Sequence, residues 1–115
     1  MSELRVGIIG VGWPGQRHIE GYQKNANARI TALADVNTAL AEQVKADYTV
    51  ASARVFPDYR DMLAADLVDA VSVCTPNYLH APMAIDALRA GKHVLLEKPL
   101  AHSLADGERL AAEVA

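Results

Sequence analysis

Three glycines near the amino terminus have the spacing of a phosphate-binding loop. Gly10, Gly12 and Gly15 form the pattern G-x-G-x-x-G between an apolar run and a stretch of helical character. In such a loop the first glycine permits a tight turn, the second lets a pyrophosphate approach the backbone, and the third allows the helix to pack closely on the strand. The helix N-terminus adds N–H donors and partial positive charge. The pattern therefore predicts a dinucleotide-binding loop.

Two residues inside this loop are unusual for it, because Trp13 is bulky and Pro14 has no backbone N–H to offer a phosphate. Proline is favoured at the first position of a helix, where the helix does not use that N–H. We expect the loop to remain competent with one donor fewer, and the Trp13 ring to point outward over the mouth of the site. The predicted cofactor contacts of the loop are Gly10, Val11, Gly12, Trp13, Pro14 and Gly15.

An acidic residue stands where such a loop requires one. Asp35 ends the second apolar run, 20 residues after Gly15. A carboxylate there can accept hydrogen bonds from the adenosine ribose hydroxyls, and it would repel a 2′-phosphate. Neither Val36, which is also predicted to line the cofactor, nor Asn37 supplies a guanidinium to offset that repulsion. The sequence therefore favours NAD over NADP.

Apolar runs alternate with helical patterns along the whole chain. The predicted strands are 4–9, 29–35, 53–56, 69–75 and 92–98, and the predicted helices are 14–25, 37–48, 58–65, 78–90 and 103–115. Asn37, Asp58 and Ser103 are the expected N-caps, and Gly91 is expected to end the fourth helix. This alternation predicts an α/β fold with a doubly wound parallel sheet of about five strands in the order 3-2-1-4-5 and helices on both faces.

The gross features exclude several classes of protein. The 115 residues suit one domain, 1–115, and a net charge of −3 without a basic stripe argues against nucleic acid or an anionic membrane as a partner. There is no signal peptide or membrane-spanning run, and the single cysteine, Cys74, cannot form an internal disulfide, so we expect a cytoplasmic protein. No histidine has a second potential ligand at a spacing typical of metal sites, so no metal site is predicted.

Two further motifs follow the later strands. The segment CTPNYLH (74–80) follows the fourth predicted strand and LLEKP (95–99) closes the fifth, at the sheet edge where ligands of such folds bind. Together with GVGWPGQRH (10–18) and the acid at the end of strand two, these motifs resemble the N-terminal domain of the Gfo/Idh/MocA oxidoreductases. The resemblance covers almost the whole chain. It implies that Thr75, Pro76 and Asn77 line the cofactor, with Asn77 and His80 toward the nicotinamide.

The same resemblance gives the second motif its roles. It implies that Glu97 binds near the nicotinamide ribose and that Lys98 contacts both the cofactor and the substrate hydroxyl as the catalytic residue, aimed by a cis bond to Pro99. Oxidising an alcohol removes a hydride from carbon and a proton from oxygen. A partly desolvated lysine near cationic NAD⁺ has a lowered pKa and can exchange that proton near neutrality.

The resemblance predicts hydride transfer between a nicotinamide cofactor and a sugar, polyol or related hydroxy compound. Family enzymes carry a second, C-terminal substrate domain that 115 residues cannot include, so we expect this chain alone to bind cofactor without turnover. We also expect self-association through the strand 92–98 as an exposed edge.

Two other interpretations of the sequence remain. The first is a non-catalytic NAD(P)-binding regulatory or interaction protein of the same fold, against which Lys98 argues. The second is a methyltransferase, which also combines a glycine loop with an acid at the end of strand two. The third glycine, Gly15, and the Glu97-Lys98-Pro99 motif argue against it.

Overall fold

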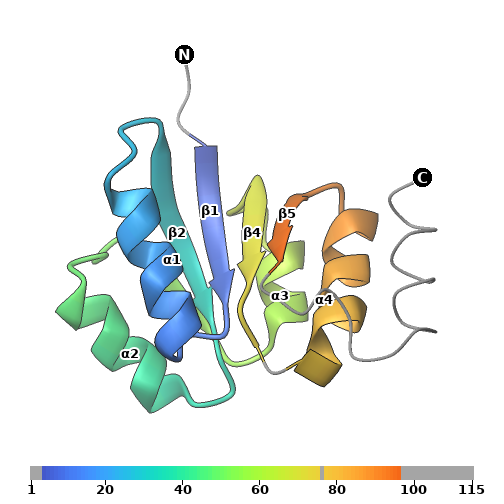
Figure 1. Cartoon of the computed structure of the whole chain (residues 1–115), viewed down its shortest axis with the longest axis horizontal. Coiled ribbons are helices and arrows are strands. Elements are labelled where there is room, and N and C mark those ends of the chain that lie inside the picture. Colours follow the sequence, from blue (N-terminus) through green and yellow to red (C-terminus); the bar gives the residue numbers. More distant parts are fainter. Residues whose placement is uncertain (1–3, 76, 97–115) are drawn as a thin grey trace.

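The computed structural model describes residues 4–75 and 77–96, and it has the predicted α/β architecture (Figure 1). The strands are β1 (Leu4–Ile9), β2 (Ala28–Ala34), β3 (Arg54–Phe56), β4 (Ala70–Val73) and β5 (His93–Leu96). The helices are α1 (Trp13–Gln23), α2 (Thr38–Asp47), α3 (Tyr59–Ala64) and α4 (Asn77–Arg89). The strands form one parallel sheet in the order β3-β2-β1-β4-β5, which confirms the predicted topology. The predicted helix 103–115 and the end of the predicted strand 92–98 lie outside the described residues.

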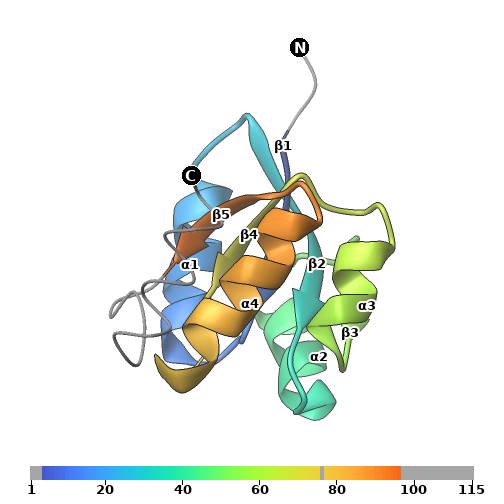
Figure 2. The same ribbon diagram turned by 90° about the vertical axis from the view of Figure 1, so that its right-hand side faces the viewer.

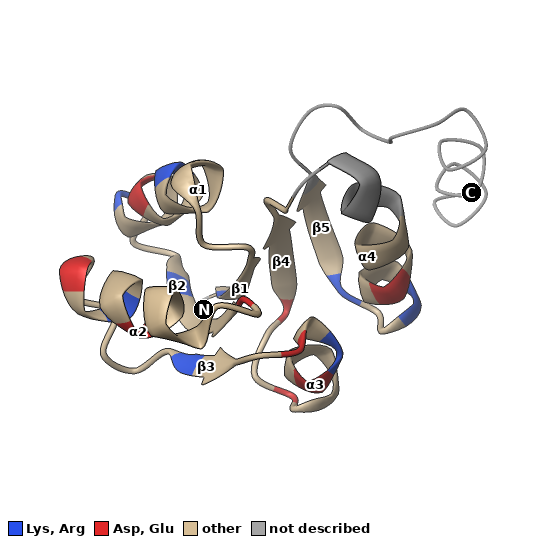
Figure 3. Cartoon of the chain, turned by 90° about the horizontal axis from the view of Figure 1, so that it is seen from below, with Lys and Arg blue, Asp and Glu red and all other residues tan. Residues whose placement is uncertain are grey.

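The two faces of the sheet are covered by different helices. Along β1, Val6 and Ile8 belong to a buried cluster that includes Ile19 of α1 and Val44 of α2. On the opposite face, Ile9 packs in a second cluster with residues of α3 and α4. Figure 3 shows the two helix pairs on opposite sides of the sheet, and Figure 2 shows α3 and α4 on the second face. Alternate side chains of one strand thus enter two separate cores, as the side-chain period of a β-strand requires.

Local signals in the sequence set most helix ends. The side chains of Asn37 and Asp58 accept hydrogen bonds from the backbone N–H groups at the starts of α2 and α3, at 3.1 and 2.9 Å, as predicted. Gly91 follows α4 with a φ of +78°, and the backbone bonds that it and Lys92 donate back to the last turn close the predicted glycine cap. The predicted boundaries differ from the observed ones by up to two residues, partly because the predicted ranges included the caps. Ser103 lies outside the described residues.

The first residue of α1 differs from the predicted one. The helix begins at Trp13, with Gly12 as its N-cap, so Pro14 is its second residue and not its first. The Gly12 carbonyl already accepts a hydrogen bond from the Gln16 N–H at 3.0 Å. Since this is the first intrahelical bond, Pro14 still occupies a position whose N–H the helix would not use.

Ionic and polar contacts join distant segments. At the amino-terminal edge of the sheet, Arg5 donates to Asp69 from its backbone N–H and its guanidinium Nη2, both at 2.9 Å. These hydrogen bonds and the positive charge of Arg5 lower the pKa of Asp69 to about 2. Within the core, the fully buried Ser72 hydroxyl shares a hydrogen bond of 2.7 Å with the hydroxyl of Tyr22, which ties α1 to β4. These contacts fix β1 and α1, the two elements that flank the glycine loop.

Candidate functional site

The three glycines of the loop have three different environments. Gly10 has a φ of +88°, and a Cβ built there would lie 2.8 Å from Thr75 Cγ2. A Cβ on Gly15 would lie 2.0 Å from the carbonyl oxygen of Gly10, so α1 packs directly on the turn. A Cβ on Gly12 would meet nothing within 4 Å. The loop is therefore closed at its first and third glycines and open at the second, which is the arrangement that a pyrophosphate-binding turn needs.

Asp35 lies directly against this loop. Its Oδ2 accepts a hydrogen bond from the Val11 N–H at 3.0 Å, and its Oδ1 accepts one from the Asn37 N–H at 2.9 Å. The half-buried carboxylate is thereby held at the end of β2, beside the opening at Gly12. Each carboxylate oxygen can accept a second hydrogen bond, so the group keeps capacity for ribose hydroxyls.

Two large apolar side chains are exposed beside the loop and the acid. Trp13 is 71% exposed and Val36 is 91% exposed. The guanidinium carbon of Arg17 lies 5.5 Å from the centre of the Trp13 ring, a cation–π distance. The Trp13 ring thus points into solvent at the start of α1 and does not obstruct Gly12.

The segment after β4 meets the loop at Thr75. The close approach of its Cγ2 to Gly10 places Thr75 against the first glycine, and its hydroxyl donates to the sulfur of Met83 at 3.2 Å. The backbone of Asn77 and His80 forms the first turn of α4. Pro76, Glu97, Lys98 and Pro99 lie outside the described residues, as do the side chains of Asn77 and His80. Of the predicted site, the structure therefore brings together the six loop residues, Asp35, Val36 and Thr75.

Two residues that the sequence analysis did not select contact this site. The Gln16 amide donates from Nε2 to the carbonyl oxygen of Val11 at 3.0 Å, and the Tyr48 hydroxyl donates to Gln16 Oε1 at 3.2 Å. A glutamine one position after the third glycine is a weak signal that could have been noticed. Tyr48 follows α2 and carries no such signal, because only the fold brings it to α1.

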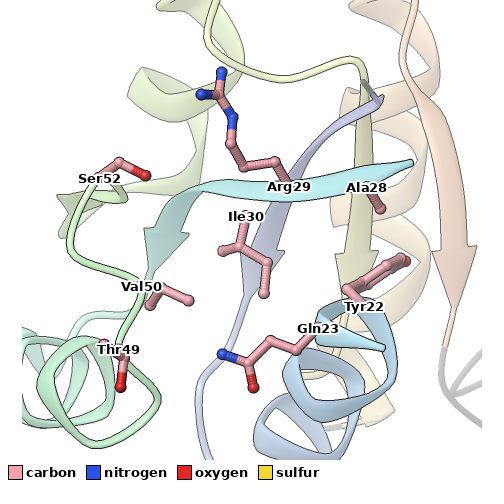
Figure 4. Close-up of a pocket in the computed structure, with 8 residues that line it drawn as sticks. All are labelled: Tyr22, Gln23, Ala28, Arg29, Ile30, Thr49, Val50 and Ser52. Atoms are coloured by element: carbon pink, nitrogen blue, oxygen red, sulfur yellow. The ribbon is translucent and has the colours of Figure 1, made fainter. Parts of the chain in front are cut away.

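The structure also has a hollow of about 200 Å³ away from the loop. It lies between the end of α1, the start of β2 and the segment 49–52, and Ile30 and Val50 are among its apolar lining residues (Figure 4). Figure 4 shows the Arg29 side chain pointing away from those two residues. Since Ile30 is near the start of β2 and Asp35 follows its end, this hollow is separate from the glycine loop.

The described residues show neither a metal-binding cluster nor a membrane-spanning helix. Residues 4–75 and 77–96 contain no group of three or more His, Cys, Asp or Glu side chains placed to hold a metal ion. None of the described helices has the length and apolar character needed to cross a bilayer.

The fold and the loop together define a dinucleotide-binding domain. Residues 4–115 match the model of a family described as an oxidoreductase family with an NAD-binding Rossmann fold, named GFO_IDH_MocA. The chain belongs to this family, as its motifs predicted.

Named relatives and solved structures agree with that assignment. The chain is 44% identical over 105 residues to an inositol 2-dehydrogenase/D-chiro-inositol 3-dehydrogenase of Shouchella clausii, covering 90% of this chain and 30% of the relative. It is 40% identical over 111 residues to a glycosyl hydrolase family 109 protein of Shewanella sp. (strain ANA-3), covering 90% of this chain and 24% of the relative. The fold matches a crystal structure of Lactobacillus casei myo-inositol dehydrogenase in complex with NAD(H) and myo-inositol. That match has a TM-score of 0.91 at 30% identity, and it covers 96% of this chain and 33% of the other. The chain thus spans a third or less of the length of these proteins.

Proposed function

We propose that this chain binds NAD at the carboxyl-terminal edge of its sheet, with the pyrophosphate at Gly12 and the adenosine ribose at Asp35. The observation that carries the proposal is the loop, which is open at Gly12, closed at Gly15 and bonded through Val11 to Asp35. Family membership and the crystallised NAD(H) complex of a relative support the same cofactor. Val36 and Thr75 border this site, and we assign Pro76, Asn77, His80, Glu97 and Lys98 to the remainder of the cofactor contacts, on the family motifs.

We further propose that NAD binds more tightly than NADP. The Asp35 carboxylate would face the 2′-phosphate of NADP, and the two negative charges would repel each other. Calorimetric titration with both cofactors tests this, with Asp35→Asn as the size-matched variant. We expect the parent to prefer NAD by at least about tenfold and the variant to lose most of that preference. Equal or tighter binding of NADP by the parent would refute the role given to Asp35.

For the reaction, we propose hydride transfer between the nicotinamide and a sugar, polyol or related hydroxy compound. Bound NAD supplies the hydride acceptor, and Lys98 exchanges the hydroxyl proton. Names of relatives that refer to inositol and to glycosyl groups support this substrate class. Because the compared proteins are about three times as long as this chain, we propose that the walls of the substrate site come from a separate domain and that the 115-residue chain binds NAD without turnover. NADH formation from myo-inositol by the pure chain would contradict this.

We also propose that the chain self-associates in this form. Among the described strands, β5 is the last in the sheet and pairs only with β4. Leu95 on β5 is 53% exposed, and an apolar strand at the edge of a sheet favours pairing with a strand of another chain. Light scattering over a concentration series tests the proposal. A mass that stays at one chain at every concentration would refute it.

A further inference from the structure

The Val11 residue of the glycine loop is held from two sides. Asp35 accepts a hydrogen bond from its N–H at 3.0 Å, and the Gln16 side chain donates one to its carbonyl oxygen at 3.0 Å. The side chain of Val11 is fully buried. The backbone between Gly10 and Gly12 is therefore fixed at both of its polar groups, by one residue at the end of β2 and one in α1.

The Val11 carbonyl belongs to the same peptide unit as the N–H of Gly12. A trans peptide is planar, and its C=O and N–H point in opposite directions. Fixing the carbonyl toward Gln16 consequently fixes the direction of the Gly12 N–H. That N–H has no hydrogen-bond acceptor among the described residues, and it belongs to the glycine at which the loop is open.

The Tyr48 hydroxyl lies against the oxygen end of the Gln16 amide. This hydroxyl lies 3.2 Å from Gln16 Oε1 and 3.3 Å from Glu20 Oε2, and it accepts a hydrogen bond from Arg17 at 3.0 Å. The carbonyl of Val11 can only accept, so the amide must turn its NH₂ group toward Val11 and its oxygen toward Tyr48. Both ends of the Gln16 amide thus face a hydrogen-bonding group, and the single proton of the Tyr48 hydroxyl is shared between Gln16 Oε1 and Glu20 Oε2.

We propose that Gln16, supported by Tyr48, is a positioning residue that holds the Gly12 N–H in the direction required by the pyrophosphate of NAD. This inference rests on the proposed cofactor site. A donor held in place before the ligand arrives loses less conformational freedom on binding, which strengthens binding. Removing the Gln16 donor should therefore weaken NAD binding although Gln16 itself is not assigned a contact with the cofactor.

The test compares two glutamines of the same helix. Gln16→Met keeps the side-chain length and removes the donor, and Gln23→Met does the same in the last turn of α1, where Gln23 bonds to the backbone of Tyr48. NAD affinity is measured by calorimetry and by the fluorescence of Trp13, the single tryptophan of the chain, and stability is measured by thermal unfolding. We expect about tenfold weaker NAD binding for Gln16→Met and an unchanged Kd for Gln23→Met, at similar losses of stability.

Tyr48→Phe adds a coupling test. We expect it to weaken NAD binding by roughly two- to threefold alone and to have no further effect in the Gln16→Met background, because both act through one amide. If the parent protein binds NAD and Gln16→Met binds it with the same Kd, the positioning role of Gln16 is wrong and the cofactor site stands. A parent that binds no NAD would overturn the proposed cofactor site and this inference with it.

Discussion

Alanine at two glycines of the loop is expected to have two different effects, a loss of stability at Gly15 and a loss of NAD affinity at Gly12. In Gly15→Ala the new Cβ would lie 2.0 Å from the Gly10 carbonyl oxygen and 3.0 Å from its carbon. These are backbone atoms of a turn, so α1 itself must move away from β1. Overpacking of this kind costs about 1–3 kcal/mol or somewhat more, since the moving helix also carries Ile19 out of its packing. A loss of about 3 kcal/mol corresponds to a Tm lower by roughly 10–20 °C.

The matched variant is Gly12→Ala. Its Cβ would meet nothing within 4 Å, and the residue has a φ of −70° that alanine adopts readily. Alanine is a poorer N-cap than glycine by about 0.5–1 kcal/mol, but it lowers the entropy of the unfolded chain by a similar ~0.4–1 kcal/mol. The free energy of unfolding should hardly change. The methyl group would stand where a pyrophosphate approaches the backbone, so we expect at least about tenfold weaker NAD binding, or ~1.4 kcal/mol.

Thermal unfolding and NAD titration of both variants separate the two effects. The expected pattern is a large loss of stability in Gly15→Ala and a loss of affinity at unchanged stability in Gly12→Ala. If Gly12→Ala bound NAD as tightly as the parent, the opening at Gly12 would not be the pyrophosphate site. If Gly15→Ala melted at the parent temperature, the account of how α1 packs on the loop would be wrong.

The remaining predictions concern acid stability and the donors of the loop. Because Arg5 lowers the pKa of Asp69, the stability that this pair contributes is present above about pH 4 and is lost as the pH falls toward 2, and Asp69→Asn should flatten that part of the pH profile of Tm. Pro14→Ala restores an N–H, worth at best ~1.5–3 kcal/mol to an anion, so NAD should bind more tightly at a slightly lower Tm, whereas equal affinity by calorimetry would show that this N–H is not directed at phosphate. Trp13→Gly keeps the backbone N–H and loses the exposed ring. Any loss of NAD affinity that calorimetry finds in this variant therefore measures contact between the ring and the cofactor.

The sequence predicted the part of the fold that depends on local signals. Gly10, Gly12 and Gly15 were expected to differ in role, and their contacts do differ. The side-chain caps at Asn37 and Asp58 and the glycine cap after α4 were predicted because each depends on a few neighbouring residues. The strand order followed from the alternation of strands and helices and the handedness of their connections.

Contacts between distant residues could not be predicted in this way. Arg5 and Asp69 are 64 positions apart, and only the pairing of β1 with β4 brings them together. The contact of Tyr48 with Gln16 spans 32 positions and depends on how α2 packs beside α1. Asp35 was predicted to bind a ribose of the cofactor. Its hydrogen bond to Val11 could not be predicted, because that bond depends on the ends of β1 and β2 lying side by side.

The proposed function requires the glycine loop of this chain to bind a nicotinamide dinucleotide. Its most direct test is calorimetric titration of the 115-residue chain with NAD, with S-adenosylmethionine as the competing ligand class. We expect saturable binding of one NAD per chain and no binding of S-adenosylmethionine. Saturable binding of S-adenosylmethionine, or no binding of NAD by folded protein, would contradict it.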